Sequence, residues 1–256
     1  MDAQAKDKIT ERQARIVEIV TQQGFATIDT LARDFGVSTQ SVRRDIIRLD
    51  GAGLLQRFHG GVGVRETSAR MDYAEKRTLA TDAKQRIAAR AALLIPEGSV
   101  VFLDVGTTVE AVAHALREKQ RLRVFTASLA AASILSGRSG IDLFVLGGFV
   151  RGLDGSVAGE TTLSMLARFR FDYAVIGFSG IDRDGALMDY DLEKVAVKQA
   201  AMDQSSHTLI VGDSSKFRKS AVVRFAAGAK SLVFVTETQP PENISERLGG
   251  QFVIAG

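Results

Sequence analysis

Apolar residues recur at helical spacing, i, i+3 and i+4, three times within residues 10–64. The three stripes are Ile16–Ile19–Val20, Ile28–Leu31–Ala32–Phe35 and Val42–Ile46–Leu49. Thr10 and Ser38 precede the first and third stripes and are side chains that cap helices, while Gly24 and Gly51 follow them as stops. Residues 54–63 then alternate and end in paired glycines, which predicts a short hairpin. The segment therefore predicts a helix-turn-helix followed by a β-hairpin wing.

The pattern changes after the hairpin. Residues 64–80 show no consistent period and predict a connecting segment, and Thr81 to Ile95 has helical spacing. Short apolar runs then alternate with helical stretches, which predicts an α/β domain with a mainly parallel sheet. The predicted strands are Val100–Leu103, Leu122–Phe125, Leu143–Leu146, Tyr173–Ile176, Leu209–Val211, Leu232–Val235 and Gln251–Ile254. We expect a first domain at residues 1–63, a linker at 64–80 and a second domain at 81–256.

Composition excludes several classes of protein. The 256 residues contain no Cys and three His, which rules out disulfide scaffolds and cysteine nucleophiles and argues against a bound metal. We expect no cofactor. The longest weakly apolar stretch, residues 126–135, is too short to span a bilayer, and the charged N-terminus lacks the apolar core of a signal peptide. A soluble, cytoplasmic protein is expected.

The net charge of +3 is concentrated in one short segment. Residues 33–65 hold six Arg, no Lys and three acids, so this segment carries the whole excess. On a helix that buries Val42, the side chains of Gln40, Arg43, Arg44 and Arg48 share the opposite face. Arg pairs with phosphate and guanine, and Gln pairs with adenine.

This arginine face predicts DNA binding. The expected DNA-contacting residues are Ser38, Thr39, Gln40, Ser41, Arg43, Arg44 and Arg48, with Arg57, His59 and Gly60 of the wing. In the alternative, the arginines form a solvated face paired with Asp45 or Asp50. We favour DNA because the stripes, the turn, the cap and the wing coincide. For His59 a purely structural role is equally compatible.

Small polar groups follow the predicted strands in the second domain. The first strand ends in Asp104-Val105-Gly106-Thr107-Thr108 and leads into a helix, where hydroxyls, backbone N–H groups and the helix dipole suit an anion. Thr107 or Thr108 as a simple helix cap is an equal alternative. Similar strand ends add Gly147, Gly148, Arg151, Ser179, Gly180, Asp182, Asp213 and Lys216. Ordinary turn chemistry is the alternative for these, and a surface position for Arg151.

The motifs resemble those of DeoR-type bacterial repressors. In the first domain the matching runs are ERQARIVEIVTQQG and LARDFGVSTQSVRRDIIRLDGAGLLQRFHGG, with Thr39 where the family usually has Pro. In the second they are L-D-V-G-T-T, L-G-G-x-x-R, G-E, G-x-S-G-I-D-x-D-G and D-x-S-K-F, so the resemblance covers residues 10–235. The runs at Gly180–Asp182 and Asp213–Phe217 are most similar to the glycerol-3-phosphate regulon repressors.

The resemblance implies a sensor domain with a sugar-phosphate-isomerase-like fold that binds a phosphorylated sugar or polyol. It would place Asp104, Gly106, Thr107 and Thr108 at the phosphate, and Asp182, Glu193, Asp213 and Lys216 at the rest of the effector. We therefore expect a transcriptional repressor of a sugar or polyol operon. Its expected partners are operator DNA, a phosphorylated effector (glycerol-3-phosphate first) and one or three further copies of itself.

An enzyme is the alternative interpretation of the second domain. A sugar-phosphate isomerase with a DNA-binding appendage would use Glu193 with Lys194 or Lys198 as base and electrophile. No acid–base pair at a fixed spacing supports that chemistry, and a fold does not by itself imply an activity. We therefore expect no catalytic residues.

Overall fold

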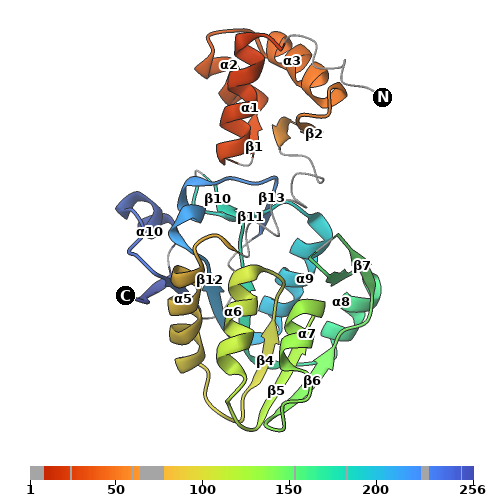
Figure 1. The fold of residues 1–256 in the computed structure, drawn as a ribbon, viewed down its shortest axis with the longest axis vertical. Coiled ribbons are helices and arrows are strands. Elements are labelled where there is room, and N and C mark those ends of the chain that lie inside the picture. Colours follow the sequence, from red (N-terminus) through yellow and green to blue (C-terminus); the bar gives the residue numbers. More distant parts are fainter. Residues whose placement is uncertain are drawn as a thin grey trace.

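The computed structural model describes residues 9–23, 25–58, 60–63, 78–152, 154–182, 184–225, 231–248 and 250–256 (Figure 1). Most of the expected linker, residues 64–77, lies outside these ranges, as does His59. Arg151 is described as part of a strand, but its side chain is not. Among the described residues, no helix is both long enough and apolar enough to cross a membrane.

The N-terminal unit packs three helices on a small sheet. Its elements are α1 (Glu11–Gln23), β1 (Phe25–Thr27), α2 (Ile28–Asp34), α3 (Thr39–Gly51), β2 (Gln56–Phe58) and β3 (Gly61–Gly63). The predicted stripes form its core, with Ile16, Leu31 and Leu49 fully buried. The strands pair antiparallel in the order β1-β3-β2, so the predicted wing is confirmed. Sequence analysis missed β1, which is only three residues long.

Side chains fix where these helices begin. The Thr10 hydroxyl accepts from Gln13 N at 3.3 Å, and the Gln13 side chain accepts from Thr10 N at 3.0 Å, which is a capping box. Ser38 caps α3 as predicted, because its hydroxyl accepts from Ser41 N at 3.2 Å. The Ser38 cap marks the end of the turn that joins α2 to α3.

The C-terminal unit is built on a seven-stranded parallel sheet in the order β15-β14-β12-β9-β4-β5-β6. The strands are β4 (Val100–Leu103), β5 (Leu122–Thr126), β6 (Ile141–Val145), β9 (Phe171–Gly177), β12 (Ser205–Val211), β14 (Leu232–Thr236) and β15 (Gln251–Ile254). All seven were predicted, and the parallel pairing is confirmed. Strand β6 begins two residues earlier and ends one residue earlier than expected.

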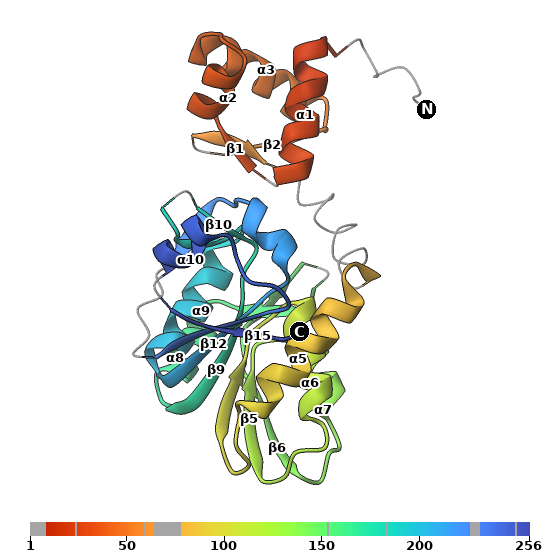
Figure 2. The same ribbon diagram turned by 90° about the vertical axis from the view of Figure 1, so that its left-hand side faces the viewer.

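Helices cover both faces of this sheet (Figure 2). One face holds α5 (Thr81–Leu93), α6 (Thr107–Leu116) and α7 (Leu129–Leu135); the other holds α8 (Glu160–Leu166), α9 (Leu192–Asp203) and α10 (Glu242–Leu248). Strand β9 shows why: Ala174 and Ile176 pack on the second face, and Val175 between them packs on the first. The centre of the strand, residues 174–176, is apolar because both of its faces are buried there.

Short strands outside the main sheet surround its carboxyl edge. They are β7 (Phe149–Arg151) with β8 (Ser156–Ala158), and β10 (Gly180–Ile181) with β11 (Leu187–Asp189) and β13 (Val223–Phe225); a 3-10 helix, η1, spans Ser214–Arg218. Runs of two or three residues carry too little periodicity to be predicted from sequence. They matter because β11 positions Asp189 beside the ends of β4 and β9.

The strand order reverses between β4 and β9. From β4 the chain winds outward through β5 to β6, and from β9 it winds the other way through β12 and β14 to β15. Helices that leave two adjacent strands on opposite faces open a crevice at the strands' carboxyl ends, where open α/β sheets bind ligands. The fold therefore points to the ends of β4 and β9 as the place for a small molecule.

Candidate functional site

The first candidate site is the exposed face of α3. Val42, Ile46 and Leu49 point into the core, whereas Gln40, Arg43, Arg44 and Arg48 are exposed, as is Thr39. Ser38 and Ser41 sit at the start of the helix, and their hydroxyls lie 3.0 Å apart. The face thus combines guanidinium groups with hydroxyls at a helix N-terminus, a combination that suits a phosphodiester backbone and base edges.

Asp45 does not pair with this face. It is 4% exposed and accepts from Arg12 Nε at 2.7 Å and from Gln13 Nε2 at 2.8 Å, so it ties α3 to α1. Asp50 accepts from the Arg57 backbone at 3.3 Å. Within the described ranges, the arginines of α3 form no ion pair. The charges of this face are therefore open to a partner, which weakens the alternative of an internally neutralised surface.

The wing places a further cation beside α3. Arg57 is exposed on β2, and Gly60 forms the hairpin turn at φ +87°, a conformation that favours glycine. His59, also predicted here, lies outside the described residues.

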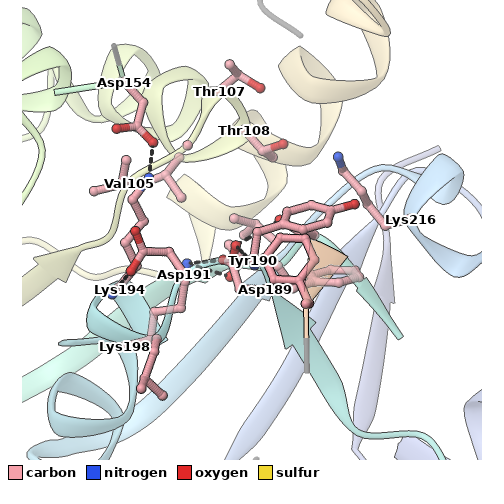
Figure 3. Close-up of a pocket in the computed structure, with 18 of the residues that line it drawn as sticks. Val105, Thr107, Thr108, Asp154, Asp189, Tyr190, Asp191, Lys194, Lys198 and Lys216 are labelled. Atoms are coloured by element: carbon pink, nitrogen blue, oxygen red, sulfur yellow. Dashed lines mark hydrogen bonds and ion pairs between the residues drawn. The ribbon is translucent and has the colours of Figure 1, made fainter. Parts of the chain in front are cut away.

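The second candidate site is a cavity of about 420 Å³ at the carboxyl ends of β4 and β9. Its walls come from the β4–α6 turn, the end of β9, the β11–α9 segment and η1 (Figure 3). Of the predicted effector residues, the cavity brings together Gly106, Thr107, Thr108, Ser179 and Lys216. They come from three separate segments of the chain, so only the sheet topology unites them.

The start of α6 forms one wall. Gly106 precedes the helix at φ +136°, where an L side chain would be strained, and no side chain among the described residues caps the helix. Thr107 and Thr108 line the cavity rather than closing the helix end. Figure 3 shows both threonines and the Lys216 ammonium group directed toward the same space. Free N–H groups, hydroxyls and a cation are the groups that suit an anion.

A buried ionic cluster forms the floor. Lys198 of α9 pairs with Asp104 at the end of β4, and its ammonium lies 3.2 Å from Asp189 Oδ2 and 3.0 Å from the carbonyl of Gly177. The second contact of Asp104 is the Gly177 amide, at 3.0 Å. All three ammonium protons thus have protein acceptors, and the cluster locks β4, β9, β11 and α9 together.

Burial and ion pairing act in opposite directions on these groups. Complete burial raises the pKa of Asp104, an effect that the nearby Lys198 only partly offsets. Burial also opposes ionisation of Asp189, but the Lys198 charge and the Tyr190 amide hold the pKa of Asp189 below its ordinary value. Burial lowers and the two carboxylates raise the pKa of Lys198, with a net increase. Lys198 and Asp189 are therefore charged at neutral pH.

Two further lysines border the cavity. Lys194, one helical turn before Lys198, pairs with Asp154 of the β7–β8 turn. Lys216 lies beside Asp213, whose carboxylate caps η1; although burial opposes ionisation, hydrogen bonds from Ser215 and the Lys216 charge keep the pKa of Asp213 low. Asp213 itself does not line the cavity; it caps η1, which carries Lys216.

The other predicted effector residues lie outside the cavity lining. Gly147 contacts α8, because its carbonyl accepts from the Thr162 hydroxyl at 2.8 Å. A Cβ would lie 2.2 Å from the Thr162 hydroxyl oxygen on Gly148 and 2.3 Å from the Lys219 carbonyl oxygen on Gly180, so these two glycines permit close packing. Asp182 pairs with Arg224 at 3.2 Å, and Glu193 is exposed in the first turn of α9. Asp104 is not part of the cavity lining, but it contacts Lys198 and Gly177, which are. Their contact with an effector stays a prediction.

Sequence analysis missed several residues that line the cavity. Asp189, Tyr190, Asp191 and Phe178 were not predicted at all, and Lys194 and Lys198 entered only as parts of an enzyme site. The available signal was Asp191, whose side chain caps α9 by accepting from the amides of Glu193 and Lys194. A recognised cap would have placed Lys194 and Lys198 on one face, four residues apart.

Comparison with known families covers both units. A model of the DeoR C-terminal sensor domain matches residues 79–238, and a model of the DeoR-like helix-turn-helix domain matches residues 12–68. The chain belongs to the DeoR family. The DeoR-type assignment of both regions, predicted from the motifs, is confirmed.

Individual relatives match most of the length of this chain. The glycerol-3-phosphate regulon repressor of Escherichia coli (strain K12) is 37% identical over 241 residues, 94% of this chain and 96% of the relative. The repressor of the same name from Haemophilus influenzae is 39% identical over 83% of each chain. Ribose 5-phosphate isomerase A of Methanocaldococcus jannaschii, a solved structure, matches 54% of each chain at 17% identity and a TM-score of 0.40.

The protein is thus a DeoR-family DNA-binding transcriptional repressor with a C-terminal sensor domain. Close relatives of this length are repressors rather than enzymes, as expected.

Proposed function

We propose that this DeoR-family repressor controls genes for sugar or polyol catabolism and leaves its operator when a phosphorylated metabolite occupies the sensor cavity. The observation that carries the proposal is the convergence of the uncapped start of α6 with Thr107, Thr108 and Lys216 at the point where the strand order reverses. Effector and operator then weaken each other reciprocally, by typically ~1–3 kcal/mol of coupling.

The exposed arginine face of α3 supports operator binding. Arg44→Ala removes one guanidinium without touching the core, so operator affinity should fall by about 1–3 kcal/mol if Arg44 contacts a base, or the salt slope should fall by about 1 if it contacts phosphate. Arg15→Ala is the matched control, because Arg15 is an exposed arginine on α1, away from this face.

The binding assay uses a duplex that the wild-type protein selects from a random library. Arg15→Ala should bind this duplex as the wild type does. Unchanged binding by Arg44→Ala at physiological salt would remove α3 from the DNA interface.

The chemistry of the cavity supports an effector with an anionic end and a hydroxylated end. A phosphate would take the N–H groups at the start of α6, the two threonine hydroxyls and the Lys216 charge. Asp189 accepts from Ser179 at 3.1 Å and from the Tyr190 amide at 2.7 Å, and a carboxylate retains capacity for further donors. A polyol hydroxyl would donate to it.

Glycerol-3-phosphate is the first candidate effector, because the relatives that cover most of this chain carry it in their names. It has one phosphate and two hydroxyls on three carbons, which matches an anion site and a nearby carboxylate. The cavity of about 420 Å³ also has room for phosphorylated sugars, so these belong in the same screen.

Thr107→Asp tests the anion site. The added carboxylate at the start of α6 should repel phosphate, so the variant should bind operator but no longer release it. Thr161→Asp is the control, because Thr161 occupies an exposed position in the first turn of α8, outside the cavity.

Thermal shift with glycerol-3-phosphate reads out binding directly. At 100 times its dissociation constant a ligand adds roughly 2.7 kcal/mol of stability. We expect that shift in the wild type and in Thr161→Asp, and its loss in Thr107→Asp. An unchanged shift in Thr107→Asp would place the phosphate elsewhere.

We further propose that the protein acts as a homodimer or homotetramer. Winged and other helix-turn-helix repressors use two-fold symmetry to reach both halves of an operator. The edge strand β6 and the neighbouring hairpin expose a row of apolar side chains, Phe144, Val145, Phe149 and Val150, with Leu129 beside them. An unpaired sheet edge with exposed apolar groups favours pairing with a second copy.

A further inference from the structure

The wing sheet has two different faces. Directly paired residues of antiparallel strands point to the same side, so Val62 shares one face with Ala26, and both are buried in the core of the N-terminal unit. The other face carries Phe58 and Phe25, whose rings meet edge to face at 6.1 Å. Glycine at position 61 lets the Phe25 ring lie against the backbone, because a Cβ there would be 2.3 Å from it. The outer face of the wing therefore carries two aromatic rings beside Gln56.

This outer face meets the sensor cavity. Gln56 and Phe58 line the same space as Thr107, Thr108, Lys216 and Tyr190. Both wing side chains are only partly exposed. Aromatic side chains on the outside of an isolated wing would face water, and here they have the sensor domain opposite them. The cavity thus has walls from both parts of the chain.

We propose that the effector site is composite and that Gln56 and Phe58 of the wing form its roof. This inference rests on the proposed function, because it assumes that the cavity holds the effector. The Gln56 amide offers donors to a phosphate or acceptors to a hydroxyl, and the Phe58 ring covers the carbon chain. A roof that excludes water also strengthens the ionic contacts beneath it.

The same strand carries Arg57, one of the expected DNA contacts. Arg57 lies between Gln56 and Phe58, and alternation along β2 directs it to the opposite side, where it is exposed. An effector that contacts Gln56 and Phe58 holds the wing on the sensor domain, and with it the position of Arg57 and of α3. Operator DNA selects arrangements in which the wing has left the cavity. The two ligands then compete for one strand, which gives the reciprocal weakening a physical path.

Engineered cysteines test the docked wing, because the chain has no native Cys. Gln56→Cys with Leu192→Cys joins the wing to the cavity rim, where Leu192 lines the same space and is 70% exposed. Gln56→Cys with Glu118→Cys is the control pair, since Glu118 follows the far end of α6, roughly 15 Å from its start. Each oxidised pair is compared with its own reduced form, which provides the reference for operator binding.

Under mild oxidation the intramolecular disulfide should form at least tenfold faster in the rim pair than in the control pair. Glycerol-3-phosphate should accelerate it and operator duplex should slow it. The oxidised rim pair should bind operator at least tenfold more weakly, and reductant should restore binding. Equal cross-linking rates in the two pairs, or full operator affinity in the oxidised rim pair, would overturn the composite site.

A second variant covers the case in which the cysteine pair disturbs folding. The chain has no Trp, so Phe58→Trp provides a single tryptophan, in the roof, whose emission can be excited selectively. Its emission should shift to shorter wavelength with a ligand that also raises the melting temperature, and to longer wavelength with operator. An emission that is unchanged by such a ligand would refute the roof, while the Arg44 and Thr107 tests would leave the proposed function standing.

Discussion

Removing the Lys198 ammonium should destabilise the sensor domain more than removing any exposed charge. Lys198→Met keeps most of the side-chain volume but leaves Asp104 and Asp189 without their shared cation, and the side chains of Lys198 and Asp104 are each 3% exposed. Breaking a buried pair by deleting one partner costs about 3–5 kcal/mol. For a domain of this size each kcal/mol lowers the melting temperature by about 2–4 °C, so a decrease of about 6–20 °C is expected.

The stability that Lys198→Met loses should depend on pH and should be larger at pH 7 than at pH 5. In the wild type, the depressed pKa of Asp189 means that its contribution is present above the ordinary carboxyl value and is lost as pH falls through the folded pKa. The pKa of Lys198 is raised, so its stabilising contribution is fully present below the ordinary lysine value of 10.5 and is lost as pH rises through the folded pKa. Without Lys198, burial alone acts on both carboxyls and raises their pKa values. The variant then binds protons on folding, so its deficit should be largest at pH 7 and smaller at pH 5.

Urea unfolding of wild type and Lys198→Met at pH 7 and pH 5 measures this prediction. Lys194→Met is the matched control, because Lys194 lies one turn earlier on α9 and pairs with a single carboxylate, Asp154, near the surface. It should cost no more than about 1 kcal/mol. The reasoning is refuted if Lys198→Met lowers the free energy of unfolding by less than 1 kcal/mol, or by the same amount at both pH values. Either result would mean that the variant does not leave a buried carboxylate without a compensating cation.

Three further changes probe other parts of the molecule. Asp45→Ala leaves the Gln13 amide buried without its acceptor, so the N-terminal unit should lose about 1–3 kcal/mol in chemical denaturation, and an unchanged midpoint would deny Asp45 its role between α1 and α3. Gly106→Ala meets no atom within 4 Å but places a side chain at φ +136°, so thermal unfolding should show a loss of about 1–3 kcal/mol; full stability would mean that the turn adapts. Phe149→Lys alters a side chain that is 75% exposed, so light scattering should show a smaller assembly without loss of folding, whereas unchanged mass would exclude the β6–β7 edge as the contact between copies.

Local signals explain why much of the fold could be predicted. The stripe Val42–Ile46–Leu49 and the Ser38 cap act within a few residues of one another, so α3 and its exposed arginine face follow from the sequence alone. The seven main strands are short, mainly apolar runs between helical stretches, a pattern that indicates a parallel sheet. The short strands β1, β7, β8, β10, β11 and β13 escaped prediction because their pairing partners lie far away or their length is too small for a period.

The candidate site was predictable only in part, for a related reason. Gly106, Thr107 and Thr108 form one continuous motif, and a motif of this kind carries its own chemistry. Asp189 and Lys198 have no such motif: Lys198 contacts both Asp104 and Asp189 because the ends of β4 and β11 lie against the middle of α9. Conversely, Gly148 and Gly180 resemble ligand-binding glycines in sequence but permit close packing of neighbouring segments.

The sequence by itself determined the two kinds of domain, the cations that face outward on α3 and the anion motif at the start of α6, because helix faces, caps and strand periods are set by neighbours along the chain. The tertiary structure decided which polar groups share a cavity. The reversal of strand order between β4 and β9 joins α6, β11, α9 and η1, and the wing adds Gln56 and Phe58. Such contacts depend on the relative placement of whole elements, which packing of the buried faces fixes and no local pattern encodes.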